Sequence, residues 1–420
     1  MTATTIRGIA ATTTVVPSTL DEAQALMTSA DAAHLTIAFV GGGTELSFGY
    51  APTRVDVLLD TSKLDRIVEY QPADMVVEVE AGVTLGALQA HLAPHGQRLA
   101  LDAPEPERAT IGGLVATNAF GPLRTRFGSM RDLIVGVSFI RADGARVRGG
   151  GKVVKNVAGF DLPKLAVGSL GSLGMIATVT LRLHPVPQAA LGVDATLSAE
   201  DVVNVVRESF RRQLEPALLV ASRLGSGQYR LTAVFEGFES GALEQRERFL
   251  DLGRVFDPSI SAGDDAIARV AALDRDARCT GDLRLRIALP PAEFVRAERD
   301  IVAPLLRAFA DLAPEGTAGS KAIAYPSLGV AFFAGSLRNA ESASRSEDAS
   351  MHVASAIVAA RRVAEARGGN LVVTHCDDTV VNERVDVYGT LPPSFALMRG
   401  LKDRFDPEHR LNPGRFLGKL

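Results

Sequence analysis

The chain of 420 residues contains no tryptophan and only two cysteines, Cys279 and Cys376. An iron–sulfur cluster needs about four thiolates, so the chain cannot ligate one by itself. Two cysteines are also too few for a disulfide framework. Uncharged apolar runs of about 18 residues are missing, so we expect no transmembrane segment. The N-terminal stretch has no sustained apolar run and does not resemble a signal peptide, so the expected location is the cytoplasm.

An excess of positive charge is missing too. The 45 basic and 49 acidic side chains give a net charge of −4, so we expect no nucleic-acid partner. His91 and His95 are four residues apart, but Pro94 between them argues against a helical zinc pair, and no metal site is predicted. Hydrophobic residues make up 46% of the chain, as in ordinary globular proteins, and its length suggests two or three domains at about 100–200 residues each.

Residues 1–190 contain most of the glycine-rich turns. Hydrophobic periodicity there predicts helices at 21–29, 84–93 and 110–120, and short strands at 35–40, 55–59, 75–79 and 175–183. The Asp143-Gly144 pair predicts a hairpin between 133–141 and 145–148.

After Pro187 the pattern changes to longer helices that alternate with short strands. Helices are expected at about 200–213, 292–311 and 353–366, and strands at 217–222, 230–235, 283–288, 329–333 and 371–374. This alternation favours an α+β domain made of two β-α-β-β-type halves.

Several glycine segments fall close together in the first half. Gly41–Gly43 follows a predicted strand, and backbone N–H groups without neighbouring side chains can converge on an anion such as a pyrophosphate. The Rossmann fingerprint is absent, because Gly168, Gly171 and Gly174 have another spacing and lead into a strand. Together, these glycine segments suit a domain whose backbone approaches a long ligand at several places. A loop-rich β domain that uses glycine only for turns is the alternative.

Six segments in order resemble the FAD-binding oxidases of the vanillyl-alcohol-oxidase type, whose FAD domain is called PCMH-type. Within that family the chain is most similar to the glycolate oxidase (glycolate dehydrogenase) group, and there to the smaller of its flavoprotein subunits. The segments are GGGTELSFG (41–49), VEVEAGVTLGALQAHL (77–92), ATIGGLVATNAFG (109–121), GSMRDLIVGVSFIRADG (128–144), KVVKNVAGFDLPKLAVGSLGSLGMIATVTLRLHPVP (152–187) and FDPEHRLNPGRF (405–416).

The resemblance implies an α+β fold of three parts. Residues 1–190 would form the FAD-binding domain, with two subdomains divided near residue 75. Residues 191–395 would form a smaller ferredoxin-like cap, and 396–420 would return to the FAD domain. The implied cofactor is FAD, held without a covalent bond because neither 41–49 nor 109–121 contains His or Cys.

The resemblance also implies which residues bind the cofactor. One group would cradle the pyrophosphate, a second would line the ribityl and isoalloxazine region, a third would pack the adenosine half, and the C-terminal tail would touch the flavin ring. In that order they are Gly41, Gly42, Gly43 and Thr44; Thr110, Gly112, Gly113, Thr117 and Asn118; Gly168, Gly171, Gly174 and Ile176; and Asn412.

The implied activity is an FAD-dependent oxidoreductase acting on CH–OH groups. We expect the FAD-binding subunit of a glycolate (2-hydroxy-acid) oxidase or dehydrogenase complex. A catalytic flavoprotein subunit and an iron–sulfur subunit would be its partners, and any peripheral place at the inner membrane would come through them. The alternatives are a self-sufficient oxidase or dehydrogenase of a hydroxy acid such as D-lactate, and a non-catalytic flavin-containing scaffold.

A catalytic base is harder to place. Catalytic subunits of the group carry a G-x-G-N-x-H metal motif, and here Gly368-Gly369-Asn370 leads to Val372 at the histidine position. His375, near Asp377 and Asp378, is the candidate base, although such a cluster is more often a solvated loop.

Overall fold

The structure is a computed structural model. The chain forms two compact units. The first unit contains Met1–Gly121, Phe127–Val186 and Thr390–Leu420, and the second contains Pro122–Arg126 and Pro187–Gly389. The division after Val186 and Gly389 falls a few residues before the predicted boundaries at 190 and 395. The residues that the structure describes are 5–151, 161–225, 227–257, 259–263, 265–310, 320–336 and 347–420.

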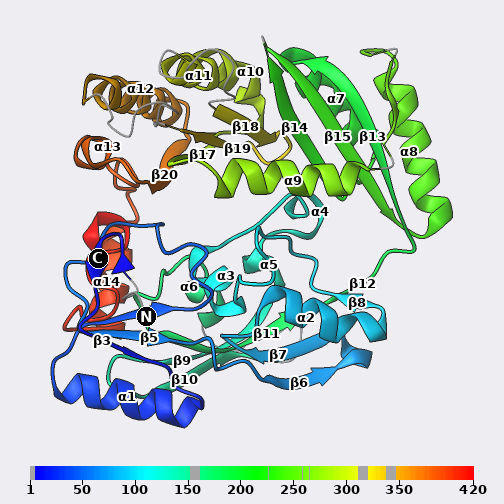
Figure 1. Ribbon diagram of the computed structural model, residues 1–420. Helices are drawn as coiled ribbons and strands as arrows, with labels where there is room; N and C mark the ends of the chain where they lie inside the picture. Colours follow the sequence, from blue (N-terminus) through cyan, green and yellow to red (C-terminus); the bar gives the residue numbers. More distant parts are fainter. Residues whose placement is uncertain are drawn as a thin grey trace. The chain divides into compact units, whose positions relative to one another are not determined.

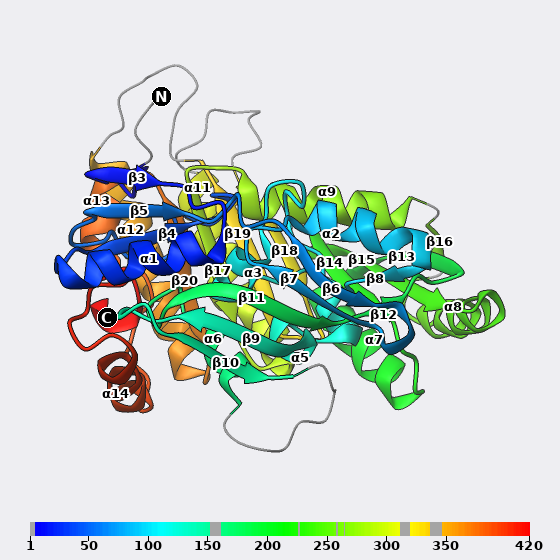
Figure 2. The ribbon, with the colours of Figure 1, turned by 90° about the horizontal axis from the view of Figure 1, so that it is seen from below.

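The first unit begins with a small parallel sheet that carries the glycine loop. Its strands are β3 (Thr13–Val15), β5 (Val57–Asp60) and β4 (Ile37–Val40), in that order, and α1 (Leu20–Ala32) runs beside them (Figure 2). Helix α1 starts where the Thr19 hydroxyl accepts a hydrogen bond from the Glu22 N–H, as an N-cap does. Its predicted position, and those of β4 and β5, are confirmed to within a few residues.

A five-stranded antiparallel sheet forms the larger part of the first unit. Its order is β10 (Arg146–Gly150), β9 (Ile134–Ile140), β11 (Met175–Arg182), β7 (Val76–Glu80) and β6 (Ile67–Gln71). The predicted hairpin is confirmed, because Arg146 pairs with Ile140 and Gly144 takes a φ of 80° in the turn. The first sheet ends at Asp60 and the second begins at Ile67, before the expected subdomain division near 75.

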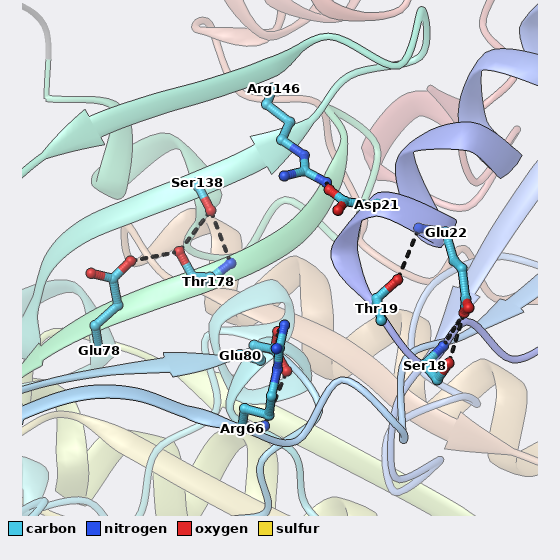
Figure 3. Close-up of polar contacts among 10 residues, drawn as sticks. All are labelled: Ser18, Thr19, Asp21, Glu22, Arg66, Glu78, Glu80, Ser138, Arg146 and Thr178. Carbon is cyan, nitrogen blue, oxygen red and sulfur yellow. Dashed lines mark hydrogen bonds and ion pairs between the residues drawn. The ribbon is translucent and has the colours of Figure 1, made fainter.

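The glutamates of β7 alternate with valines along the strand, yet both are buried. Glu78 is 5% and Glu80 is 0% exposed. Arg66 covers Glu80 with two hydrogen bonds to one carboxylate oxygen, at 2.7 and 3.1 Å, and Thr178 donates to Glu78 (Figure 3). Buried carboxylates are tolerated when such partners satisfy them.

Shorter elements complete the first unit. They are two two-stranded sheets and the helices around the larger sheet: β1 (Thr5–Ile6) with β2 (Ile9–Ala10), β8 (Gln97–Arg98) with β12 (His184–Pro185), α2 (Leu85–Leu92), α3 (Ile111–Thr117), α5 (Met130–Leu133), α6 (Leu162–Ala166) and α14 (Phe395–Phe405). Helix α4 (Arg124–Phe127) lies where the sequence passes between the units.

The second unit is built on one eight-stranded antiparallel sheet. In the order of the sheet, its strands are β16 (Ser261–Ala262), β13 (Ala189–Ser198), β15 (Gln228–Gly237), β14 (Leu218–Gly225), β18 (Ser320–Tyr325), β19 (Val330–Gly335), β17 (Leu283–Ala288) and β20 (Asn370–Cys376). The sheet consists of two β-α-β-β-α-β halves that meet where β14 pairs with β18. The predicted α+β arrangement with two β-α-β-β-type halves is therefore confirmed.

Helices cover both faces of this sheet. They are α7 (Ala199–Arg211), α8 (Glu239–Gly253), α9 (Ala266–Cys279), α10 (Phe294–Ala297), α11 (Ala303–Ala310), α12 (Glu347–Ala366) and α13 (Thr379–Arg384). Figure 1 shows α9 on the side of the sheet opposite α10, α11 and α12. Helix α9 contacts strands of both halves, including β13, β15, β18 and β19.

Some elements of the second unit differ from the prediction. The expected single helix at 292–311 is interrupted by a π-helical turn, η4 (Glu298–Val302), between α10 and α11. Helix α12 begins at Glu347, before the predicted residue 353. Strand β13 and helices α8 and α9 were not predicted. The two helices have too many polar residues to leave a clear apolar period, whereas Val193, Ala195 and Leu197 do alternate with polar residues in β13. No described helix is both long and apolar enough to cross a membrane.

Candidate functional site

The first unit contains a cleft that is lined by apolar side chains, glycines and a few polar groups, as small-molecule and cofactor sites are. Three separate parts of the chain and the C-terminal tail form its walls. The residues that line it are Phe39, Val40, Gly41, Gly42, Gly43, Thr44, Glu45, Leu46, Thr61, Ala81, Thr110, Gly112, Gly113, Leu114, Ala116, Thr117, Leu170, Gly171, Gly174, Met175, Ile176, Asn412 and Arg415.

The first wall is the loop that follows β4. A Cβ atom on Gly41 would stand 2.2 Å from Thr110 Oγ1, and Gly43 has a φ of 73°, so both positions need glycine. Within the described part of the chain, the backbone N–H groups of Gly41–Thr44 donate to no protein acceptor. The loop therefore brings four available donors to the cleft, which is what an anionic ligand requires.

The second wall is the start of α3. Thr110 caps this helix by accepting a hydrogen bond from the Gly113 N–H, and the Thr117 hydroxyl donates to the Gly113 carbonyl. The Gly112 N–H donates to the Ala81 carbonyl, and a Cβ on Gly112 would lie 2.6 Å from Ala81 Cβ. Glycine at 112 thus allows α3 to pack directly on the chain after β7.

The third wall is the loop before β11. The Leu170 N–H donates to the Ala116 carbonyl, which ties the loop to α3. A Cβ on Gly171 would lie 2.5 Å from Asn412 Nδ2, and one on Gly174 would lie 2.9 Å from the Ile140 carbonyl oxygen. The loop is therefore pressed against its neighbours at both glycines, and it leaves Met175 and Ile176 facing the cleft.

The C-terminal tail supplies the last wall. Asn412 is 2% exposed, its N–H donates to the Ile37 carbonyl, and its Nδ2 donates to the Leu170 carbonyl at 2.7 Å. Among the described residues, Asn412 Oδ1 has no hydrogen-bond partner. A buried carbonyl oxygen without a partner costs about 1–3 kcal/mol, so a ligand that donates to Oδ1 would be stabilised.

These features fit FAD. Backbone donors suit its pyrophosphate, apolar side chains such as Leu114 and Ile176 suit its rings, and Asn412 Oδ1 offers an acceptor. Of the residues that line the cleft in the described structure, none is His or Cys, so no side chain there is suited to a covalent flavin link. When bound, FAD supplies a hydride acceptor.

Most, but not all, of the predicted cofactor residues line the cleft. Asn118 and Gly168 do not: Asn118 ends α3 with a φ of 51°, and a Cβ on Gly168 would lie 3.6 Å from Asn118 Cβ. Arg415 was missed, although it lies in the segment 405–416 that suggested the family. Its Nη2 donates to the carbonyls of Leu46 and Phe48. Residues 152–160, which belong to one of the segments that suggested the family, lie outside the described residues.

Comparison with known proteins agrees with this site. A family model described as an FAD binding domain matches residues 11–150. The chain is 29% identical over 97% of its length to a D-lactate dehydrogenase of Archaeoglobus fulgidus, covering 91% of that protein. It is 38% identical over 36% of its length to glycolate oxidase subunit GlcE of Escherichia coli, covering 42% of that protein. Residues 11–150 are therefore an FAD-binding domain of the PCMH type. The two relatives are named for the oxidation of D-lactate and of glycolate, which both carry a CH–OH group.

The fold of the chain is also found among solved structures. Alkyldihydroxyacetonephosphate synthase has a TM-score of 0.69 and 17% sequence identity, and the match covers 95% of this chain and 75% of that one. At this identity the similarity concerns the fold alone.

The candidate base of the second unit does not form the expected cluster. His375 lies on β20 with 15% of its side chain exposed, and its Nε2 is 3.2 Å from Asp377 Oδ1. The Asp378 carboxylate instead caps α13 and accepts a hydrogen bond from Ser350. In the residues that the structure describes, no group of three or more His, Cys, Asp or Glu side chains could hold a metal ion.

Two further groups of residues have structural partners. Arg126 donates to the Glu236 carbonyl at 2.7 Å at the end of β15. His91 and His95 both pack edge-on against Tyr70, with ring centroids 5.5 and 5.2 Å away. Neither arrangement resembles a binding site.

Proposed function

We propose that the chain oxidises a small 2-hydroxy acid, of the size of glycolate or D-lactate, with FAD held in the cleft of the first unit. The observation that carries this proposal is the similarity to a D-lactate dehydrogenase along nearly the whole of both chains. The substrate would lose its hydroxyl proton to a base and a hydride to FAD, giving a 2-oxo acid.

The residues proposed to hold FAD are those that line the cleft. Gly41–Thr44 would bind the pyrophosphate through backbone N–H groups, and α3 with the loop before β11 would enclose the rest. Asn412 would accept a hydrogen bond from the cofactor through Oδ1, because that oxygen is buried and has no partner among the described residues.

His375 is the proposed proton acceptor. An imidazole next to a carboxylate is the arrangement in which a base is oriented and its protonated form stabilised. The 3.2 Å separation between His375 Nε2 and Asp377 Oδ1 supports this role.

An anaerobic absorbance spectrum tests the proposal. The purified chain, loaded with FAD, is mixed with glycolate and in parallel with D-lactate. Bleaching of the flavin band near ~450 nm by either acid supports a self-sufficient enzyme. A matched sample with a 2-hydroxy acid of opposite configuration, L-lactate, serves as the control for unspecific reduction.

A second candidate is the FAD-binding subunit of a glycolate oxidase complex that passes electrons to an iron–sulfur partner. The 38% identity to subunit GlcE favours it, and so does Val372 at the position where catalytic subunits of the group carry a histidine. A flavin that binds but stays oxidised with every acid would favour this candidate over the first. If the flavin also cannot be reduced in a redox titration, it would serve as a structural scaffold.

A further inference from the structure

Lys402 is a buried lysine in the first unit that no step of the proposed chemistry uses. It lies on α14 and is 1% exposed. Its ammonium group donates to the carbonyl oxygens of Ser172 at 2.8 Å and Leu411 at 2.9 Å, and to Asp406 Oδ2 at 2.5 Å. All three of its protons are therefore committed to protein acceptors.

Asp406 completes the arrangement. It is 0% exposed, and its carboxylate also accepts hydrogen bonds from the N–H groups of Leu411 and Arg410, at 2.8 and 3.0 Å. Burial lowers the pKa of Lys402, and the neighbouring Asp406 carboxylate acts in the opposite direction. A buried ion pair usually contributes no more stability than apolar side chains would. The role of Lys402 and Asp406 is therefore sought in the groups that they contact.

The two carbonyls held by Lys402 are next in sequence to the cleft. Ser172 follows Gly171, and Leu411 precedes Asn412, both of which line the cleft. Gly171 and Asn412 have φ values of 70° and 46°. Asparagine is one of the few non-glycine residues that adopt this left-handed conformation readily, and the contacts of its neighbours hold it here.

We propose that Lys402 is a positioning residue that fixes Asn412 and the loop Leu170–Ser172 at the cofactor cleft. The Nδ2 of Asn412 donates to the Leu170 carbonyl, so the two cleft walls are joined to each other as well as to Lys402. The inference rests on the proposal that this cleft holds FAD, and it is independent of the substrate.

A double-mutant cycle on FAD affinity tests this. Lys402→Met, Asn412→Ala and the double variant are prepared as apoproteins, and FAD is titrated by quenching of its fluorescence. We expect each single variant to bind FAD at least tenfold more weakly. The double variant should bind FAD only slightly more weakly than the single variant with the lower FAD affinity, because Lys402 acts in part through Asn412. The visible absorption band of bound FAD should also change shape in Lys402→Met.

Asp56→Asn is the matched control. Asp56 is another buried carboxylate of the first unit, but it precedes β5 and lies at the end of that strand away from Thr61, the residue that lines the cleft. This variant should lose stability and keep its FAD affinity. If Lys402→Met behaves in the same way, or if the effects of Lys402→Met and Asn412→Ala simply multiply, Lys402 is only structural and the inference is wrong.

Two further outcomes, a variant that does not fold and a chain that does not bind FAD, have different meanings. If Lys402→Met does not fold, Asp406→Asn takes its place in the same cycle, because it keeps the size of the side chain and one acceptor oxygen, and the same results decide. If the unaltered chain does not bind FAD at all, the assignment of FAD to the cleft fails, whereas normal FAD binding by the variants contradicts only the role of Lys402.

Discussion

Gly42 lies directly against the backbone of Arg108: a Cβ atom at position 42 would stand 1.6 Å from the Arg108 carbonyl oxygen. Backbone cannot move aside as the end of a side chain can. Gly42→Ala should therefore displace the loop Gly41–Thr44 and lower FAD affinity by at least about tenfold, or about 1.4 kcal/mol. Titration of the apoprotein with FAD measures this.

Gly400→Ala provides the matched control for that variant. Gly400 is in α14 of the same unit, and a Cβ there would meet nothing within 4 Å. Because alanine favours a helix more than glycine, this change should stabilise the unit by about 0.5–1 kcal/mol and leave FAD binding unaltered. Equal FAD affinity in Gly42→Ala and Gly400→Ala would show that the glycine loop does not touch the cofactor.

The ionisation of Asp56 should make the stability of the first unit depend on pH in the acid range. Burial alone would raise the pKa of Asp56, but hydrogen bonds from Thr36 and Arg54 outweigh it, and the net shift is below the ordinary 3.8. A lowered pKa in the folded state means that the stabilisation is present above about pH 3.8 and is lost as the pH falls below it.

Asp56→Asn should therefore cost about 1–3 kcal/mol of unfolding free energy at neutral pH, where hydrogen bonds to a charged group are lost. The difference from the unaltered chain should shrink as the pH falls from about 4 toward 2. Urea unfolding at a series of pH values measures it, with Asp74→Asn at an exposed position as the control. A difference that stays constant over this range would contradict the prediction.

The sequence predicts the fold well where periodicity is strong and poorly where charge is buried. Strand β17 was predicted at its observed bounds, because Leu283, Leu285 and Ile287 alternate with polar residues. The burial of Glu78 and Glu80 in β7 does not follow from their alternation with valines, because the partners that satisfy them come from other parts of the chain. These partners are Arg66, Arg148 and Thr178. Such pairings depend on tertiary contacts that no local pattern contains.

The candidate site shows the same limit. Gly41–Gly43 and Asn412 could be named because each stands in a recognisable motif. The role of Lys402 could not, because its partners Ser172 and Leu411 are brought to it only by the folded chain. Asn118 and Gly168 were predicted for the cofactor, yet neither lines the cleft.

His375 offers a test of the chemistry that is separate from cofactor binding. If it takes the hydroxyl proton, His375→Gln should slow anaerobic flavin reduction by about 10²–10⁴-fold at saturating substrate. FAD content should not change, because the cleft is built from residues of the first unit. Asp377→Asn should have a smaller effect, since Asp377 only orients the imidazole. Stopped-flow absorbance measures both rates, and an unchanged rate in His375→Gln would remove it as the base.

Tyr229 and Glu298 connect the two halves of the second unit. The Tyr229 hydroxyl on β15 donates to the Glu298 carboxylate on the π-helical turn, and Arg223 on β14 donates to the same carboxylate at 3.0 Å. Burial and the adjacent carboxylate raise the pKa of Tyr229 above its ordinary value of 10.0. A raised pKa in the folded state means that the stabilisation is complete below pH 10.0 and is lost as the pH rises further.

Tyr229→Phe should thus lower the unfolding free energy by about 1–3 kcal/mol at neutral pH, because the buried carboxylate loses a donor. Above about pH 10 the unaltered chain should lose stability faster than the variant, since only its unfolded state gains an ionised Tyr229. Denaturant unfolding between about pH 7 and 11 would measure both effects. If the unfolding free energies of the two proteins fell in parallel above pH 10, Tyr229 would ionise as readily in the folded as in the unfolded state. The contact with Glu298 would then not hold the two halves together.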